Sequence, residues 1–138
     1  MIRFVLDASV ALAWVVDQNP APYAESVRQR IRAGSRPVLP VFWQLEVANT
    51  LALVRRRRIL DDYEVDESLD YFHAFLTSIA EVDTSYPTIR EVVQVSKETG
   101  LTAYDAVYFD LARRENLPLA TLDKTLRGAA AKAGVSDF

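Results

Sequence analysis

Short apolar runs alternate along this chain with longer stretches of helical periodicity. The first apolar run, residues 2–6, ends at Asp7 and has the length of a buried strand rather than a helix. Two similar runs, residues 37–40 and 117–121, predict further strands, and residues 81–83 predict a short third one. The carboxyl ends of these strands therefore become the places to search for polar residues.

The stretches between the apolar runs predict helices. The clearest are residues 8–16, 23–32, 42–58, 103–115 and 124–133, with glycine closing two of them. Capping residues predict where two further helices begin.

Asp61 is followed three residues later by Glu64, which is typical of a capping box. Ser85 precedes a helix that has Pro87 in its first turn and that ends at Gly100. We also expect a last edge strand at residues 135–138. Strands that alternate with helices predict an α/β fold, a three-layer α/β/α sandwich with a short, mostly parallel central sheet. No linker or internal repeat divides residues 1–138, so one domain is expected.

Four acidic residues fall where such a sheet would bind a ligand, which is beyond the carboxyl ends of its strands. Asp7 directly follows the first strand, and Asp123 follows the last apolar run. Glu46 lies in the opening turns of the helix after the second strand. Asp105 lies in the first turn of a helix capped by Thr102, and it joins the others if that helix begins at the same edge.

Four carboxylates in one pocket would repel one another unless a cation is present. Carboxylate oxygens favour Mg²⁺ or Mn²⁺, and the absence of cysteine argues against a thiolate zinc site. Such ions activate water in phosphodiester hydrolysis. A metal-free acid–base ribonuclease commonly needs two histidines, whereas this chain has only His73, for which we expect no catalytic role.

Each acid also has a purely structural interpretation. Asp7 could bond backbone donors in a turn, and Glu46 could be an acid favoured by the helix dipole. Asp105 stands three residues after Thr102, as in a capping box, and Asp123 could be the N-cap of the final helix. A cap and a metal ligand are compatible roles for one side chain, so both interpretations stay open at this point.

The charge balance bears on the partner. The net charge of −3 argues mildly against nucleic acid, but two bound divalent ions would raise it to +1. Two arginine-rich stretches, residues 55–58 and 28–36, could each contact phosphates or simply be solvated, and we expect one or two of their eight arginines to touch RNA. No targeting segment or membrane-spanning run is apparent, and a cytoplasmic protein is expected.

Aromatic residues on the predicted helices are expected to pack in the core or at a dimer interface. They are Trp14, Phe42, Trp43, Tyr104, Tyr108 and Phe109.

Taken together, four stretches resemble the motifs of PIN domains, in order and over nearly the whole chain. They are Leu6-Asp7-Ala8-Ser9, Pro40 with Glu46-Val47-Ala48-Asn49-Thr50-Leu51, Leu101-Thr102-Ala103-Tyr104-Asp105-Ala106-Val107-Tyr108 with Leu111-Ala112, and Leu117-Pro118-Leu119-Ala120-Thr121-Leu122-Asp123. The chain is most similar to the VapC-type toxins within this family.

The resemblance implies a metal-dependent endoribonuclease, usually a homodimer, that a cognate antitoxin silences. It implies metal ligation by Asp7, Glu46, Asp105 and Asp123, and products with a 5′-phosphate and a 3′-hydroxyl group. Ser9, Asn49 and Thr121 are candidates for residues that support the metal ligands.

Two other classes of function are considered. A receiver-like phospho-transfer domain needs an acid pair after its first strand, and a dehalogenase-type phosphatase needs an aspartate where Ser9 stands. A non-catalytic PIN-like module that binds RNA or protein would not need all four acids. The sequence identifies neither the RNA nor the number of metal ions.

Overall fold

The computed structural model describes residues 1–138 as four strands and seven helices. In chain order they are β1 (Arg3–Leu6), α1 (Ala8–Val16), α2 (Pro22–Arg32), β2 (Arg36–Pro40), α3 (Trp43–Arg56), α4 (Asp62–Ser78), β3 (Glu81–Asp83), α5 (Ile89–Thr99), α6 (Ala103–Glu115), β4 (Leu119–Ala120) and α7 (Lys124–Lys132). No helix combines the length and the apolar character that crossing a membrane would require.

The four strands form one parallel sheet in the order β3-β2-β1-β4. Val5 of β1 aligns with Val38 of β2 on one side and with Leu119 of β4 on the other. Because β1 lies inside the sheet and both of its faces are covered, Phe4, Val5 and Leu6 are completely buried. The predicted α/β class and short parallel sheet are confirmed.

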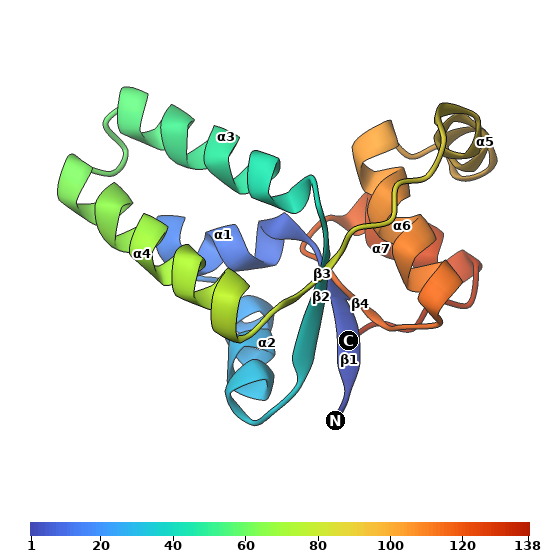
Figure 1. Cartoon of the computed structure of the whole chain (residues 1–138), viewed down its shortest axis with the longest axis horizontal. Coiled ribbons are helices and arrows are strands. Elements are labelled where there is room, and N and C mark those ends of the chain that lie inside the picture. Colours follow the sequence, from blue (N-terminus) through green and yellow to red (C-terminus); the bar gives the residue numbers. More distant parts are fainter.

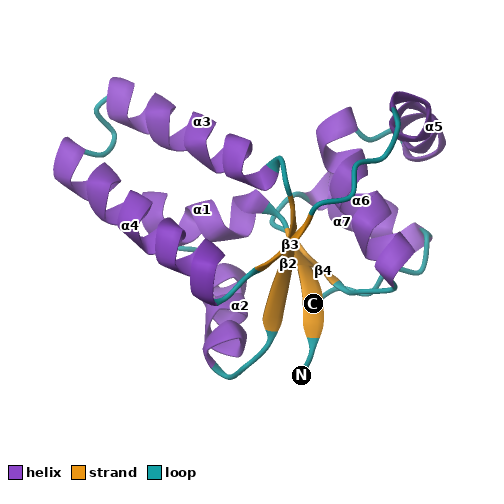
Figure 2. Cartoon of the chain, in the orientation of Figure 1, coloured by secondary structure: helices purple, strands orange, loops and turns teal.

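The helices form a layer on each face of the sheet, which completes the three-layer sandwich. Helices α1 to α4 lie on one face and α5 to α7 on the other (Figure 1, Figure 2). Helix α6 packs directly on β1, β2 and β4. Thirty-one buried apolar residues make a continuous core that runs from Phe4 to Ala130.

The chain reverses its winding direction beside β1. From β1 the sheet grows through β2 to β3 on one side, whereas β4 joins the opposite side. The loop after β1 consequently leads to α1 on one face, and the loop after β4 leads to α7 on the other (Figure 1). Such a switch point leaves a crevice at the carboxyl ends of the two strands, and ligands of α/β proteins bind there.

The start of α5 differs from the prediction of a helix after Ser85. Thr88 is the N-cap, and its hydroxyl accepts the Glu91 N–H at 3.1 Å. The Ser85 N–H instead donates to the Asp83 carboxylate at 3.3 Å, which holds this residue in a turn after β3. Pro87 therefore lies in the loop and not in the first helical turn, because a second capping residue three positions later takes over.

The predicted edge strand at residues 135–138 is also wrong, since only a single bridge forms, between Asp137 and Leu119. Pairing cannot extend because β4 itself has two residues, with Pro118, which lacks an N–H, directly before it. Two backbone hydrogen bonds to Leu119, from its N–H to Ser136 O at 2.9 Å and from the Phe138 N–H to its carbonyl at 3.1 Å, hold this end together with the Phe138 ring, which stacks on Phe4 with centroids 3.7 Å apart.

Candidate functional site

Asp7 stands at the switch point, as the N-cap residue of α1, and is only 5% exposed. Its Oδ2 atom accepts hydrogen bonds from the Thr121 hydroxyl at 2.6 Å and the Ser9 hydroxyl at 2.7 Å. Burial raises the pKa of this carboxyl group, while the Thr121 and Ser9 hydroxyls oppose the rise. The side chain makes no capping bond to α1, so its orientation comes from the two hydroxyls.

Backbone donors from the loop after β4 complete a hydroxyl ring, which we define as Ser9 and Thr121 around Asp7. The Asp123 N–H donates to Thr121 Oγ1 at 3.0 Å, and the Leu122 N–H donates to Ser9 Oγ at 3.1 Å. Each hydroxyl therefore accepts from the β4 loop and donates to the carboxylate that follows β1. The ring fixes Asp7 and joins the two loops of the switch point.

Glu46 approaches the same crevice from the first turn of α3. Its Oε1 atom is buried and has no hydrogen-bond partner. Burial raises the pKa of Glu46 to about 7, and the nearby charges of Asp7 and Asp105 add to the rise, while the Tyr108 hydroxyl opposes it. An unpartnered carboxylate oxygen in this position is suited to a cation.

Asp105 lies in the first turn of α6, where the Thr102 hydroxyl accepts its N–H at 3.3 Å. The reciprocal bond of a capping box does not form, so the Asp105 carboxylate is free of that role. Burial raises its pKa to about 6, helped by the charges of Asp123 and Asp7. Helix α6 thus begins at the same edge of the sheet as the other acids.

Asp123 fulfils the structural interpretation, because it is the N-cap of α7. Its Oδ1 atom accepts the N–H groups of Thr125 at 2.8 Å and Leu126 at 3.1 Å. The residue is exposed, and its charge still raises the pKa of both Asp7 and Asp105. A capping role for Oδ1 leaves Oδ2 for a ligand.

The structure brings the four acids to one edge of the sheet without forming a compact ligand cluster. Their charges act on one another, yet no three acidic or histidine side chains lie close enough to hold a metal ion as they stand. An all-carboxylate donor set with an orphaned buried oxygen fits a hard divalent cation. Binding would require the carboxylates to draw together, and their ligand roles stay a prediction.

Asn49 and Glu46 line one pocket of about 510 Å³ together with Phe42, Leu45 and Tyr104. Leu45 is 73% exposed and Tyr104 is 69% exposed. Packing of Tyr104 in the core is therefore excluded, because α6 turns this side chain outward beside Asp105. The pocket gives the acid site an aromatic wall.

Tyr108 is a residue of the site that the sequence analysis assigned to packing alone. Its ring is fully buried, and its hydroxyl accepts the Ala8 N–H at 3.3 Å and faces the Glu46 carboxyl group. A signal was present, because Tyr108 follows Asp105 by three residues and so shares its helix face.

In both arginine-rich stretches, arginines contact other side chains of the protein, and the stretch at residues 55–58 also lies far from the four acids. Arg55 pairs with Asp62 at 3.3 Å and with Asp66 at 2.9 Å, and it is about 14 Å along α3 from Glu46. In the other stretch, Arg28 lies over the Trp14 ring and Arg30 over the Phe138 ring. Contact of any of these arginines with RNA stays a prediction.

Comparison with known proteins adds a family assignment. A family model described as the PIN domain matches residues 4–132. Ribonuclease VapC3 from Pyrobaculum aerophilum is 27% identical over 125 residues, which cover 91% of this chain and 92% of that protein.

Two solved structures share the fold. PAE2754 from Pyrobaculum aerophilum has a TM-score of 0.65 and 25% identity, and the match covers 93% of this chain and 86% of that one. FitAcB from Neisseria gonorrhoeae has a TM-score of 0.63 and 17% identity, with coverage of 98% and 96%.

Proposed function

Because this chain belongs to the PIN domain family, we propose that it is a metal-dependent endoribonuclease and the toxin of a toxin–antitoxin pair. The observation that carries the proposal is the buried, unpartnered Oε1 atom of Glu46, close to Asp7 and Asp105 at the switch point of the sheet. The similarity of the chain to a protein named Ribonuclease VapC3 supports RNA as the substrate. The family assignment also removes support for a receiver-like domain.

Asp7, Glu46 and Asp105 would hold Mg²⁺ or Mn²⁺, and Asp123 would complete that site or help to hold a second ion through its Oδ2 atom. Such an ion, when bound, lowers the pKa of a coordinated water and neutralises charge on phosphoryl oxygens. The hydroxyl ring of Ser9 and Thr121 keeps Asp7 in one orientation. Hydrogen bonds of this kind around a ligand strongly affect metal affinity.

Residues beside the acids would position the RNA. Asn49 lines the pocket next to Glu46, where its amide can donate to a sugar or phosphate oxygen and accept from a 2′-hydroxyl group. His73 is exposed on α4, on the layer that carries α1 to α4, and has no place in this chemistry.

The proposal extends to protein partners. Exposed apolar side chains occur on α3, where Leu45 projects, and on α5, where Ile89 is 85% exposed and Val93 lies one turn further on. Surfaces of this kind suit a homodimer interface and the docking of a cognate antitoxin. Light scattering coupled to size-exclusion chromatography would test dimerisation, and a single mass near 15.5 kDa at all concentrations would contradict it.

The decisive experiment incubates the purified protein with mixed RNA in Mg²⁺, in Mn²⁺ and in chelator. We expect cleavage with either ion, none in chelator, and 5′-phosphate ends on the products. RNA that stays intact with every metal, with Asp7→Asn behaving like the wild type, would favour a non-catalytic RNA- or protein-binding module. In bacteria, expression of the gene alone should slow growth, and co-expression with a neighbouring small antitoxin gene should restore it.

A further inference from the structure

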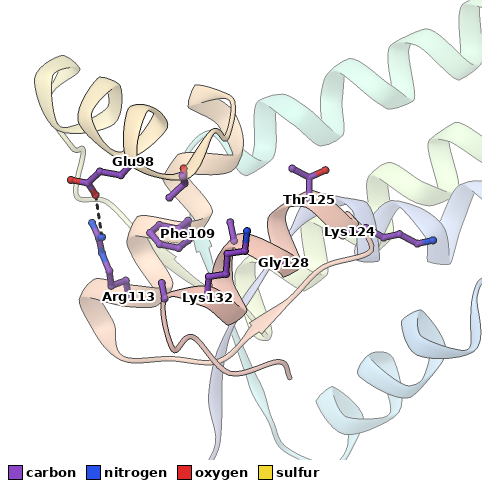
Figure 3. Close-up of a pocket in the computed structure, with 10 residues that line it drawn as sticks. Glu98, Phe109, Arg113, Lys124, Thr125, Gly128 and Lys132 are labelled. Atoms are coloured by element: carbon purple, nitrogen blue, oxygen red, sulfur yellow. Dashed lines mark ion pairs between the residues drawn. The ribbon is translucent and has the colours of Figure 1, made fainter.

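A groove of about 560 Å³ lies between α5, α6 and α7, outside the set of four acids. Charged residues line it, Glu98 on α5, Arg113 on α6, and Lys124 and Lys132 on α7; Figure 3 shows Lys132 beside Phe109 and the Lys124 side chain extending outward from the start of α7. Phe109 is buried between these helices and closes the bottom of the groove. The rim therefore carries three cations and one anion, in a chain whose net charge is −3.

Some of the charged side chains on the rim have a partner within the protein and others have none. Glu98 is engaged with Arg113 at 3.8 Å, and Arg113 lies over the Phe109 ring with 5.0 Å to its centroid. Lys124 and Lys132 are exposed and form no ion pair with any acidic residue. These two ammonium groups are available to an anion from outside the chain.

Gly128 lies between the two lysines and leaves the helix surface between them open, and we call this surface, Lys124, Gly128 and Lys132, the lysine track. Lys124, Gly128 and Lys132 follow one another at four-residue intervals and so share one face of α7. The lysines are about 12 Å apart along the helix, far enough to contact different phosphates. No atom lies within 4 Å of the position that a side chain on Gly128 would take, so the face between them is open.

This track begins at the acid site. Asp123 is the N-cap of α7, and Lys124 is the first residue of the helix. We propose that the groove binds backbone phosphates of the RNA on one side of the scissile bond, with Lys124 and Lys132 as the contacts. The inference rests on the proposed ribonuclease function and adds a direction for the RNA, which would leave the acids along α7.

The groove fits a phosphate backbone better than an acidic peptide. Its apolar lining is Phe109, Ala129 and Ala133, and Phe109 is buried, so no wide apolar pocket is present for an anchoring side chain. Lysines that lack a fixed partner act as point charges, which suits phosphates in a flexible strand.

The test compares Gly128→Glu with Gly128→Gln, because the two new side chains have nearly the same size and helix propensity. The carboxylate would stand one turn from each lysine and neutralise both, whereas the amide would not. Lys124→Gln/Lys132→Gln removes the charges directly. Lys97→Gln on α5 is the matched control, since this exposed lysine does not line the groove.

Binding of a labelled 20-nucleotide single-stranded RNA in chelator and KM for the same RNA in Mg²⁺ are the measurements. We expect Gly128→Glu and the double lysine variant to raise Kd and KM roughly fivefold to twentyfold relative to Gly128→Gln and Lys97→Gln. The salt slope of binding should fall by about 1.4. With an RNA too short to leave the acid site, the difference in KM should disappear.

Equal Kd, KM and salt slope in all variants would contradict the RNA-binding role of the groove and would leave the proposed ribonuclease function unaffected. Lysine-dependent RNA binding without cleavage would support the groove and contradict the proposed function instead. If the charge variants lose only binding to a co-purifying acidic protein and keep RNA affinity, the groove binds protein and the inference is wrong.

Discussion

The two halves of the acid site are built in different ways. On the side of the strands, Asp7 is buried and its Oδ2 atom accepts two hydrogen bonds from the ring of Ser9 and Thr121. On the side of the helices, the buried Oε1 atom of Glu46 has no partner, and the Asp105 carboxylate accepts no hydrogen bond from its own helix cap. The protein alone completes the first half, whereas the second half lacks a ligand.

This difference assigns separate tasks to the two halves. A carboxylate already oriented by hydrogen bonds can bind an ion with little reorganisation. Carboxylates that repel each other make the metal-free site costly, and this cost disappears when a cation binds. The four predictions below separate these tasks, in order of decreasing effect.

Asp7→Asn should have the largest effect, a loss of at least about 100-fold in kcat with Mg²⁺, because the oriented half would lose its charge. The fold should survive, since an amide oxygen can still accept from Thr121 and Ser9. Steady-state cleavage and thermal unfolding in chelator measure the two outcomes. Wild-type kcat with unchanged Mg²⁺ dependence would contradict the ligand role of Asp7.

Thr121→Val should have the second-largest effect. It removes one of the two hydroxyls that bond Asp7 and keeps the shape of the side chain. We expect about 1–3 kcal/mol less stability in denaturant unfolding, since the Asp123 N–H loses its acceptor, and roughly 10-fold weaker Mg²⁺ activation. Ser9→Ala is the matched variant and should cost less, because Ser9 is less buried. Equal Mg²⁺ activation in all three proteins would show that the ring does not orient Asp7.

The pH dependence of stability should reveal the unpaired half. The folded-state pKa values of Glu46, about 7, and Asp105, about 6, lie above their ordinary values near 4.5 and 3.8. The folded protein therefore binds more protons than the unfolded chain in this window, and stability in chelator should rise as pH falls from about 7 towards 4.5.

Melting temperature in chelator measures this trend. Glu46→Gln should flatten it, and saturating Mg²⁺ should remove it by keeping both carboxylates ionised. If stability in chelator instead falls steadily below pH 7, as in ordinary acid denaturation, the pKa values of these acids are not raised in the folded protein. At subsaturating Mg²⁺, activity should decline as pH falls below about 7, because protons then compete with the ion for the Glu46 carboxylate.

Asn49→Ala should give the smallest effect, roughly a twofold to tenfold rise in KM for RNA, because it removes one side-chain hydrogen bond at the pocket beside Glu46. Gln44→Ala on the same helix is a control, since Gln44 is exposed and does not line that pocket. An unchanged KM in Asn49→Ala would leave Asn49 without a role in binding.

Much of this architecture could be predicted from sequence periodicity. The buried strand before Asp7 and the helix start at Asp61 with Glu64 both have local signals, and both form as expected. The start of α5 was misplaced although a local signal was present, because Thr88 is followed three residues later by Glu91, as in a capping box, whereas Ser85 has no such partner. The last strand fails because its partner β4 is too short.

Within the site, the sequence placed the acids at a common edge but could not give their spacing. The N-cap role of Asp123 was one of the two interpretations that the sequence left open, and the sequence could not show which carboxylate oxygen the cap would occupy. Tyr108 was missed because a buried tyrosine on an apolar helix face is usually a packing residue, and its hydroxyl partner comes from residues 100 positions away. The four-residue spacing of Lys124, Gly128 and Lys132 is visible in the sequence, but the groove beside them is not, since it depends on the packing of three helices.

The hydroxyl ring has a consequence for protein synthesis. The Thr121 hydroxyl that orients Asp7 lies 114 positions later in the chain, so it is synthesised well after Asp7. A nascent chain that has not yet released β4 and Thr121 from the ribosome therefore has neither the switch point nor an oriented Asp7. Under the proposed function, we expect no RNA cleavage by a nascent chain until Thr121 has left the ribosome.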